Sequence, residues 1–328
     1  MLTWNQPSAM VVPQVLQQIL QRALWRITTT IVCTMTINWF PGHMNKARRE
    51  LATALLRVDV VIELLDARLP ESSSNPMLAT LRGDKPRVLV LAKSDLADPA
   101  VTRAWLQHLE RADGSRSLAL DGTQRGTARQ VLEACRQVAP SQTGRKKPLG
   151  CMIVGIPNVG KSTLINSLLG RSIAKVGNQP AITRQQKRYQ LNTDIAVSDT
   201  PGVLWPKLED QMAAYRLAAS GAISDAAFDY LDVAGFAATF LATRYPDLLR
   251  IRYGLEIPAN ELVPREPMEL LETIGRGRGL LRQGGIVDLQ RTAETLLREL
   301  RSGKIGRISF EEPLPAAAAL NNGDEPCN

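Results

Sequence analysis

Short, continuous hydrophobic runs recur through the first two thirds of the chain. Val58–Asp66 and Arg87–Leu91 each carry a nearly unbroken apolar run, which is typical of strands buried on both faces. Cys151–Val154 has the same character, and shorter runs at Tyr189–Leu191 and Ile195–Ser198 predict further strands.

Between these runs, apolar residues recur every three to four positions, which predicts helices at Val101–Arg111, Thr127–Val138 and Ser162–Leu169. Pro140–Gly150 is polar, basic and bounded by Pro and Gly, so we interpret it as a linker. The alternation of strands and helices predicts an α/β domain over residues 35–206, with a mostly parallel sheet and helices on both faces.

After Trp205 the pattern is helical, without a convincing strand. Helical periodicity covers Met212–Ser220, Ala226–Tyr245, Met268–Ile274 and Leu289–Arg301. We therefore expect a small all-α domain at residues 207–312. The alanine-rich, polar residues 313–328 predict a disordered tail.

Residues 1–34 differ from the rest of the chain, because they hold Arg22 and Arg26 but no acidic residue. Val15–Trp25 would form an amphipathic helix, and this composition resembles a transit peptide. The alternative, which we favour because serine is scarce, is an over-extended start with Met35 as the initiator. The first interpretation implies a mitochondrial protein, and the second a bacterial cytoplasmic one.

The whole chain has 328 residues and a net charge of +8, which fits an anionic partner such as RNA or a membrane surface, although a solvated basic surface remains the alternative. Its four cysteines form no CxxC pair and it has two histidines, which argues against zinc and for a reducing compartment. No apolar run is long enough to span a bilayer. We expect a monomer without stable membrane association.

Gly155–Ser162 matches the phosphate-binding pattern GxxxxGK[ST] between a predicted strand and a predicted helix. Glycines allow backbone N–H groups to turn towards phosphate oxygens, and the helix N-terminus adds positive potential. Lys161 should reach the β- and γ-phosphates, and the Ser162 hydroxyl should ligate Mg²⁺. The predicted nucleotide contacts here are Asn158, Val159, Gly160, Lys161, Ser162 and Thr163.

Asp199–Gly202 follows a predicted strand and has the form DxxG. Asp199 can hold the Mg²⁺ shell, and the Gly202 N–H can bind the γ-phosphate. Thr183, between the two motifs, is the candidate for a switch loop that contacts Mg²⁺ and the γ-phosphate, although threonine is also an ordinary loop residue.

Ala92–Asp95 lies upstream of the phosphate-binding loop and resembles the guanine-recognition pattern Asn-Lys-x-Asp. Asp95 would accept hydrogen bonds from the guanine N1–H and exocyclic amine, the Lys93 stem would cover the ring, and Ser94 lies between them. Ala92 replaces the usual asparagine, so one hydrogen bond worth about 0.5–1.5 kcal/mol is lost. We expect weakened but guanine-selective binding of GTP and GDP; a plain strand end and turn is the alternative.

The water-positioning group is the gap in this site. Many GTPases place glutamine after the DxxG glycine, but here the residue is Val203. Asn158 could help to coordinate a monovalent cation that stabilises transition-state charge. Alternatively, Asn158 is a loop residue that favours turn geometry.

With these motifs, the chain resembles the circularly permuted ribosome biogenesis GTPase A (YlqF-type) family. Further signatures are Asn38–Met44, Asp66–Pro70 and Asp199–Lys207, and the resemblance covers about residues 37–312. It implies a GTPase that matures the large ribosomal subunit, contacts rRNA and ribosomal proteins, and is stimulated by the pre-ribosome and K⁺. It also implies that His43 is a candidate catalytic residue beside Lys161 and that the C-terminal helices bind RNA.

Basic residues on the helical side are candidates for phosphate contact, although interleaved glutamates also fit an ordinary helical surface. They are Arg244, Arg250, Arg252, Arg276, Arg278, Arg282, Arg298, Arg301, Lys304 and Arg307.

Three functions stay open at this point. The first is a GTP-hydrolysing assembly factor that binds pre-ribosomal particles in the GTP state and leaves on hydrolysis. The second is an RNA-binding scaffold with little catalysis, favoured by Ala92 and Val203. The third is a GTPase coupled to tRNA modification, suggested by Asn158. The motif order suggests that the segment after Asp199 passes the γ-phosphate state directly to the helical domain.

Overall fold

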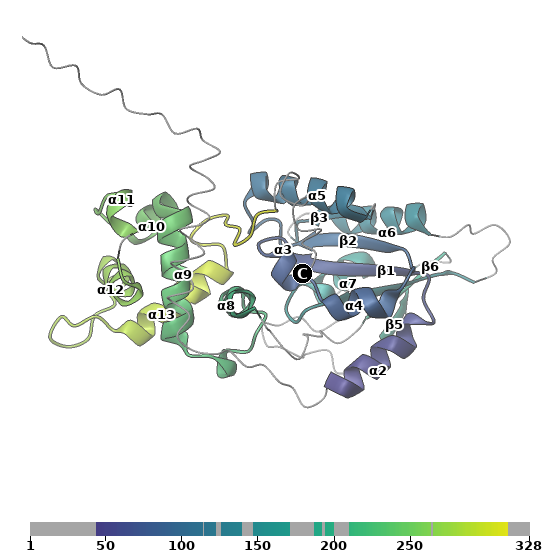
Figure 1. Cartoon of the computed structure of the whole chain (residues 1–328), viewed down its shortest axis with the longest axis horizontal. Coiled ribbons are helices and arrows are strands. Elements are labelled where there is room, and N and C mark those ends of the chain that lie inside the picture. The colour runs from purple at the N-terminus through teal and green to yellow at the C-terminus, as the bar shows by residue number, and fades with distance from the viewer. Residues whose placement is uncertain are drawn as a thin grey trace, which may run out of the picture.

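A six-stranded sheet forms the centre of the first half of the protein (Figure 1). The computed structural model describes residues 44–113, 115–122, 126–139, 147–170, 187–191, 194–199, 210–263 and 265–313. The strand order is β3-β2-β1-β4-β6-β5. Only β5 is antiparallel to its neighbour, so the predicted mostly parallel sheet is confirmed. The strands are β1 (Val60–Asp66), β2 (Arg87–Ala92), β3 (Arg116–Leu120), β4 (Leu149–Gly155), β5 (Lys187–Gln190) and β6 (Ile195–Asp199).

Helices cover both faces of the sheet because alternate side chains of each buried strand point to opposite sides. Ile62 and Ile153 belong to the core shared with α6 and α7, whereas Val61 and Met152 pack in a cluster with α2 and α4. Trp105 of α5 packs in a third cluster on strand residues of β1 and β2. These helices are α2 (Met44–Leu55), α3 (Pro70–Ser73), α4 (Pro76–Arg82), α5 (Pro99–Asp113), α6 (Thr127–Val138) and α7 (Lys161–Leu169).

The second half is helical, as the periodicity predicted, and in its described residues only an isolated bridge, Leu281 to Val287, pairs in the β manner. One predicted boundary was wrong: the helix expected from Ala226 begins at Tyr230. The Asp229 carboxylate accepts the N–H groups of Leu231 and Asp232 and so fixes the helix start there. The helices are α8 (Gln211–Ser220), α9 (Tyr230–Arg244), α10 (Pro246–Tyr253), α11 (Ala259–Leu262), α12 (Pro267–Gly277) and α13 (Leu289–Arg301), with a 3₁₀ turn at Asp225–Ala227.

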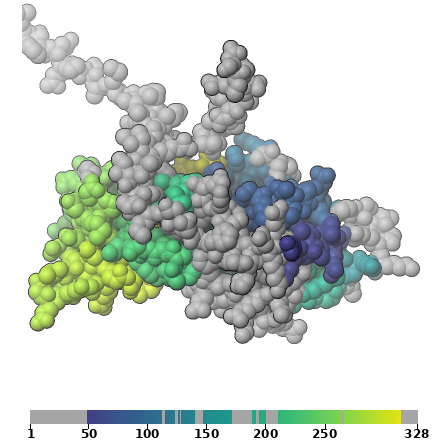
Figure 2. Space-filling view, turned by 60° about the horizontal axis from the view of Figure 1, so that its bottom comes forward, coloured from purple at the N-terminus to yellow at the C-terminus, as the bar shows by residue number. Residues whose placement is uncertain are grey.

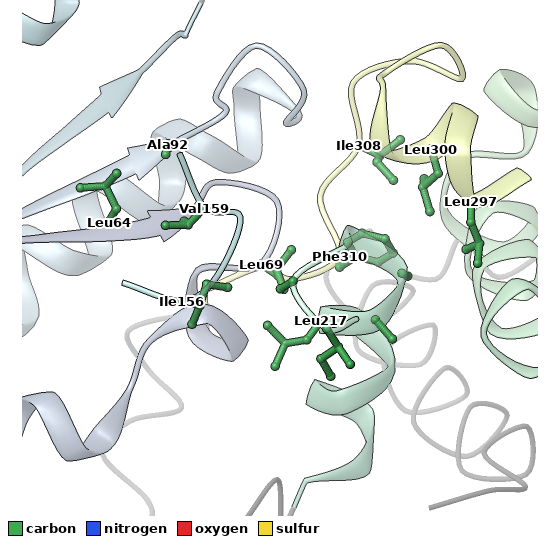
Figure 3. Close-up of a cluster of buried hydrophobic side chains, with 14 of the residues drawn as sticks. Leu64, Leu69, Ala92, Ile156, Val159, Leu217, Leu297, Leu300, Ile308 and Phe310 are labelled. Atoms are coloured by element: carbon green, nitrogen blue, oxygen red, sulfur yellow. The ribbon is translucent and has the colours of Figure 1, made fainter. Parts of the chain in front are cut away.

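The two halves share one continuous hydrophobic core. Figure 3 shows Leu69, Leu217 and Phe310 lying between the strand-side residues and the residues around α13. Leu217 is fully buried on α8, and Phe310 is 4% exposed. Figure 2 shows the helical half (green to yellow) beside the sheet half (purple to blue). Because buried apolar surface joins them, the position of the helical half relative to the sheet is set by packing.

After α13 the chain returns to the sheet half. We call residues 305–313 the C-terminal strap; its path is yellow in Figure 1. The Phe310 N–H donates to the Arg68 carbonyl at 2.6 Å, and the Trp105 indole N–H donates to the Glu311 carbonyl at 3.1 Å. Ile308 is 1% exposed. The strap therefore connects the end of the helical half to the loop that follows β1.

Candidate nucleotide-binding site

The predicted site residues that the structure describes lie at one edge of the sheet. Strands β2, β1, β4 and β6 are parallel neighbours, so their carboxyl ends meet at this edge. Lys93–Asp95 follow β2, Asn158–Thr163 follow β4, and Asp199 ends β6. This crevice is where open parallel sheets bind ligands. His43, Thr183 and Gly202 lie outside the described residues, so their roles stay predictions.

The phosphate-binding loop needs its glycines. Gly155 has φ +151°, and a Cβ there would lie 2.6 Å from the Leu64 carbonyl oxygen. Asn158 adopts φ +55°, a left-handed conformation that asparagine tolerates better than most residues. Gly160, with φ +112°, is the N-cap of α7. The loop thereby brings its backbone and the α7 N-terminus to the sheet edge, the arrangement that suits a phosphate.

Lys161 is buried in the first turn of α7. Its Nζ donates to the Gly155 carbonyl at 3.1 Å and to the Ile156 carbonyl at 2.8 Å. Burial lowers the pKa of Lys161 to about 8, against the opposing charge of Asp199 and with a smaller contribution from the charge of Lys93. A poorly hydrated ammonium on neutral carbonyls gains strongly from an anion, which is the property required for phosphate contact.

Oxygen donors for Mg²⁺ flank this lysine. Asp199 is 2% exposed and close enough to Lys161 to affect its pKa, and Ser162 is half-buried on the first turn of α7. A carboxylate and a hydroxyl, completed by phosphate oxygens and water, are ligands that Mg²⁺ accepts. The residues therefore fit a magnesium ion, which would neutralise phosphate charge when bound. Among the described residues no group of three or more His, Cys, Asp or Glu could hold a metal ion by itself.

Lys93 is held by a charged cluster that its motif alone does not reveal. It has φ +59°, and its Nζ lies 3.0 Å from Asp66 Oδ2. Arg68 donates to both Asp66 oxygens, at 2.9 and 2.8 Å, and both side chains are about fully buried. Burial by itself would raise the pKa of Asp66, but Arg68 and Lys93 hold it well below its ordinary value. The Asp66 carboxylate thus fixes the lysine that we expect to cover the guanine ring.

Asp66 and Arg68 were quoted in the sequence only as a family signature, without a role. The available signal is an aspartate that ends a buried strand and is followed two residues later by arginine. From the sequence, this aspartate and arginine could form an ordinary ion pair with no role in the site. They come close to Lys93 only because β1 and β2 are adjacent strands in the folded sheet.

The base-side residues meet across β2 and β3. The Ser94 N–H donates to the Leu120 carbonyl at 3.2 Å, and Asp95 is half-buried beside it. Ala92 is 2% exposed, and its Cβ lies 3.9 Å from where a Cβ at Gly160 would be. The residue that replaces asparagine is therefore packed against the phosphate-binding loop.

Most of the basic residues predicted for phosphate contact also have partners within the protein. Glu299 forms ion pairs with Arg252 at 2.6 Å and with Arg278 at 3.1 Å. The hydrogen bond from Arg252 is the main cause that lowers the pKa of Glu299 to about 2. Other intramolecular partners are Glu312 for Arg244, Asp247 for Arg250, Asp288 for Arg282, Asp225 for Arg301 and Thr295 for Arg298. Charge counting along the sequence cannot show which arginines already have intramolecular partners.

No helix within the described ranges is both long and apolar enough to cross a membrane.

Comparisons with known proteins show the family to which the chain belongs. A family model described as a 50S ribosome-binding GTPase matches residues 150–247. The chain is 44% identical over 294 residues to ribosome biogenesis GTPase A of Priestia megaterium. This alignment covers 87% of this chain and 100% of the relative. It is 31% identical to ribosome biogenesis GTPase A of Thermotoga maritima, in an alignment that covers 84% of this chain and 95% of the relative.

A solved structure, GNP-bound YlqF from T. maritima, is similar with a TM-score of 0.57 at 26% identity, covering 82% of this chain and 98% of that one. Along the chain, β2, which leads into the candidate guanine-recognition residues, comes before β4, which leads into the phosphate-binding loop, so the GTPase domain is circularly permuted. This chain therefore belongs to the ribosome biogenesis GTPase A family and is a GTP-hydrolysing enzyme of ribosome biogenesis.

Proposed function

We propose that this GTPase is an assembly factor for the large ribosomal subunit. It binds the precursor particle in the GTP state, and hydrolysis releases it. The family model described as a 50S ribosome-binding GTPase supports the choice of subunit. Membership in a family of ribosome biogenesis GTPases favours this function over an inactive scaffold or a tRNA-modification enzyme.

One structural observation carries the switch part of this proposal. Asn158 Nδ2 donates to the Gly221 carbonyl at 2.8 Å, so the phosphate-binding loop is joined to the C-terminus of α8. Arg68, beside the base-side loop, donates to the Ser220 carbonyl at 3.3 Å. Arg301 of α13 donates to the Ala218 and Ala219 carbonyls at 2.9 and 3.2 Å. The end of one helix thus contacts the nucleotide site on one side and the helical half on the other.

The expected roles of the site residues follow from their chemistry. Lys161 and the loop N–H groups bind phosphate oxygens, and Ser162, Asp199 and Thr183 hold Mg²⁺. Asp95 and Lys93 bind guanine, and Gly202 senses the γ-phosphate. His43 or a ribosomal group positions the attacking water. A K⁺ ion near Asn158 would add positive charge where negative charge develops.

Contact with rRNA needs cations that face solvent. Arg276, Arg291 and Lys304 are exposed on the helical half, at α12, α13 and the turn after α13. Arginine and lysine neutralise backbone phosphates without reading sequence. Accordingly, we expect these residues to contribute to particle affinity and to its salt dependence.

The test is co-sedimentation with purified precursors of the large and of the small subunit, with a non-hydrolysable GTP analogue or GDP. We expect binding to large-subunit precursors only, and stronger binding with the analogue. Equal binding in both nucleotide states would contradict the switch, and a preference for small-subunit particles would contradict the choice of subunit. Sequencing the RNA crosslinked in cells tests the tRNA alternative, since enrichment of tRNA over rRNA would replace the proposal.

A further inference from the structure

The guanine-recognition loop has backbone partners both within itself and elsewhere in the chain. Residues 93–98 connect β2 to α5, and within this loop the Leu96 N–H donates to the Lys93 carbonyl at 3.0 Å. The loop carries the half-buried Asp95 and lies partly out of solvent. Ala97 is buried, whereas Ser94 and Leu96 are half-buried. Carbonyl groups withdrawn from water need partners, and those of Ser94, Leu96 and Ala97 find theirs in another part of the chain.

The C-terminal strap supplies these partners. Arg307 donates from Nη2 to the Ser94 carbonyl at 2.8 Å and from Nε to the Ala97 carbonyl at 3.1 Å. The Ile308 N–H donates to the Leu96 carbonyl at 3.0 Å. In return, the Asp98 N–H donates to Ser309 Oγ at 3.1 Å. One guanidinium therefore bridges the carbonyl groups on either side of Asp95.

The strap is itself firmly held. The Ser309 N–H donates to the Tyr245 hydroxyl of α10's N-cap at 3.0 Å, and Ser309 is 3% exposed. The Glu311 carboxylate accepts the Glu71 N–H at 2.8 Å and pairs with Arg216 of α8 at 3.1 Å. Because these contacts fix the backbone around it, Arg307 reaches the loop from a rigid support even though its own side chain is partly exposed.

Ala92 is the reason why the guanine-recognition loop would need support from the strap. An asparagine at that position would offer side-chain hydrogen bonds near the base and the phosphate-binding loop, and alanine offers none. We propose that Arg307 is a positioning residue for guanine recognition, which holds the loop so that the Asp95 carboxylate faces the base. This inference rests on the proposed base-reading role of Asp95.

The test measures the affinities of the full-length protein for GDP and for inosine diphosphate, which lacks the exocyclic amine. Asp95 would accept two hydrogen bonds from guanine and one from hypoxanthine, so the ratio of the two affinities reports the placement of its carboxylate. In Arg307→Ala we expect GDP affinity to fall about 3- to 10-fold and inosine diphosphate affinity to fall less, so the ratio shrinks. Arg307→Lys keeps the positive charge but lacks the planar guanidinium that spans the two carbonyls, so it should give an intermediate ratio. It also serves if the alanine variant does not fold.

Two further variants separate the explanations. Arg103→Ala removes an exposed charge of α5, the helix that follows the loop, and should leave both affinities unchanged. Asp95→Asn should abolish the preference for GDP. If it does not, the base-reading role itself is wrong. If Asp95→Asn behaves as expected but Arg307→Ala lowers both affinities equally or neither, Arg307 only joins the two halves and the inference is overturned.

Discussion

Asn158 in the phosphate-binding loop and Gly221 at the end of α8 are joined by a 2.8 Å hydrogen bond from a side-chain amide to a backbone carbonyl. Asn158 is left-handed at φ +55°, and Gly221, at φ +83°, is the C-cap of α8. The α8 C-terminus carries partial negative charge on its carbonyl groups. The bond therefore fixes the Asn158 amide in one orientation and ties the loop to the helical half.

The first prediction concerns K⁺ and the Asn158 side chain. We expect GTP hydrolysis to be faster in K⁺ than in Na⁺ by on the order of tenfold, because a cation beside the β- and γ-phosphates stabilises developing charge. Asn158→Gly keeps the left-handed backbone without strain but removes the amide oxygen, so its rates in the two salts should be equal. Turnover measured at equal ionic strength checks this, and a wild-type enzyme indifferent to K⁺ would remove the cation from the account.

The second prediction concerns pH and Lys161. Its pKa is about 8 in the nucleotide-free protein, and bound phosphate favours the charged form and raises it. GDP affinity should therefore be flat below pH 8 and decline above it, approaching about tenfold per pH unit. Lys161→Met should bind weakly with no such decline. A wild-type affinity that stays constant from pH 7 to 9 would exclude this lysine as the phosphate ligand.

The sequence motifs predict most of the fold and the phosphate side of the site. The strand before Gly155 and the helix after it follow from apolar runs and from chemistry local to the chain. The strand β3 was missed because Arg116–Leu120 is short and begins with two polar residues, so its apolar run is only three residues long. The pairing of Asp66 with Lys93 depends on strands that are neighbours only in the folded sheet.

The contacts of the C-terminal strap are even harder to predict from the sequence. Arg307 looks like one more basic residue near the end of a helical domain, and its contacts with Ser94 and Ala97 span more than two hundred positions. No periodicity or local motif encodes such a contact. Its origin is the tertiary packing that places Ile308 and Phe310 in the shared core.

The third prediction concerns the buried Asp66–Arg68 pair. Asp66→Asn should lower the free energy of unfolding by about 3 kcal/mol at pH 7, because Arg68 stays charged in a site that excludes water. The pKa of Asp66 is held below its ordinary value, so its stabilisation is present above about pH 4 and is lost as the pH falls further. The difference in free energy of unfolding between the wild type and Asp66→Asn should therefore become smaller as the pH falls below about 4.

Denaturant titrations at several pH values check this prediction. Glu133→Gln is the control, since Glu133 pairs with Arg136 on the exposed face of α6 and should change stability by no more than about 0.5 kcal/mol. If Asp66→Asn changes the free energy of unfolding as little as Glu133→Gln does, the Asp66–Arg68 pair does not hold the base-side lysine, Lys93, as described.

The central claim is that nucleotide state reaches the helical half through the end of α8, and amide hydrogen exchange tests it most directly. Exchange is compared between the protein bound to a non-hydrolysable GTP analogue and bound to GDP, over residues 210–313. The account predicts a difference at Ala218–Ala222 that extends into α13, where Arg301 donates to the α8 carbonyls, and a smaller difference in Asn158→Gly. Identical exchange in the two nucleotide states throughout these residues would contradict the account.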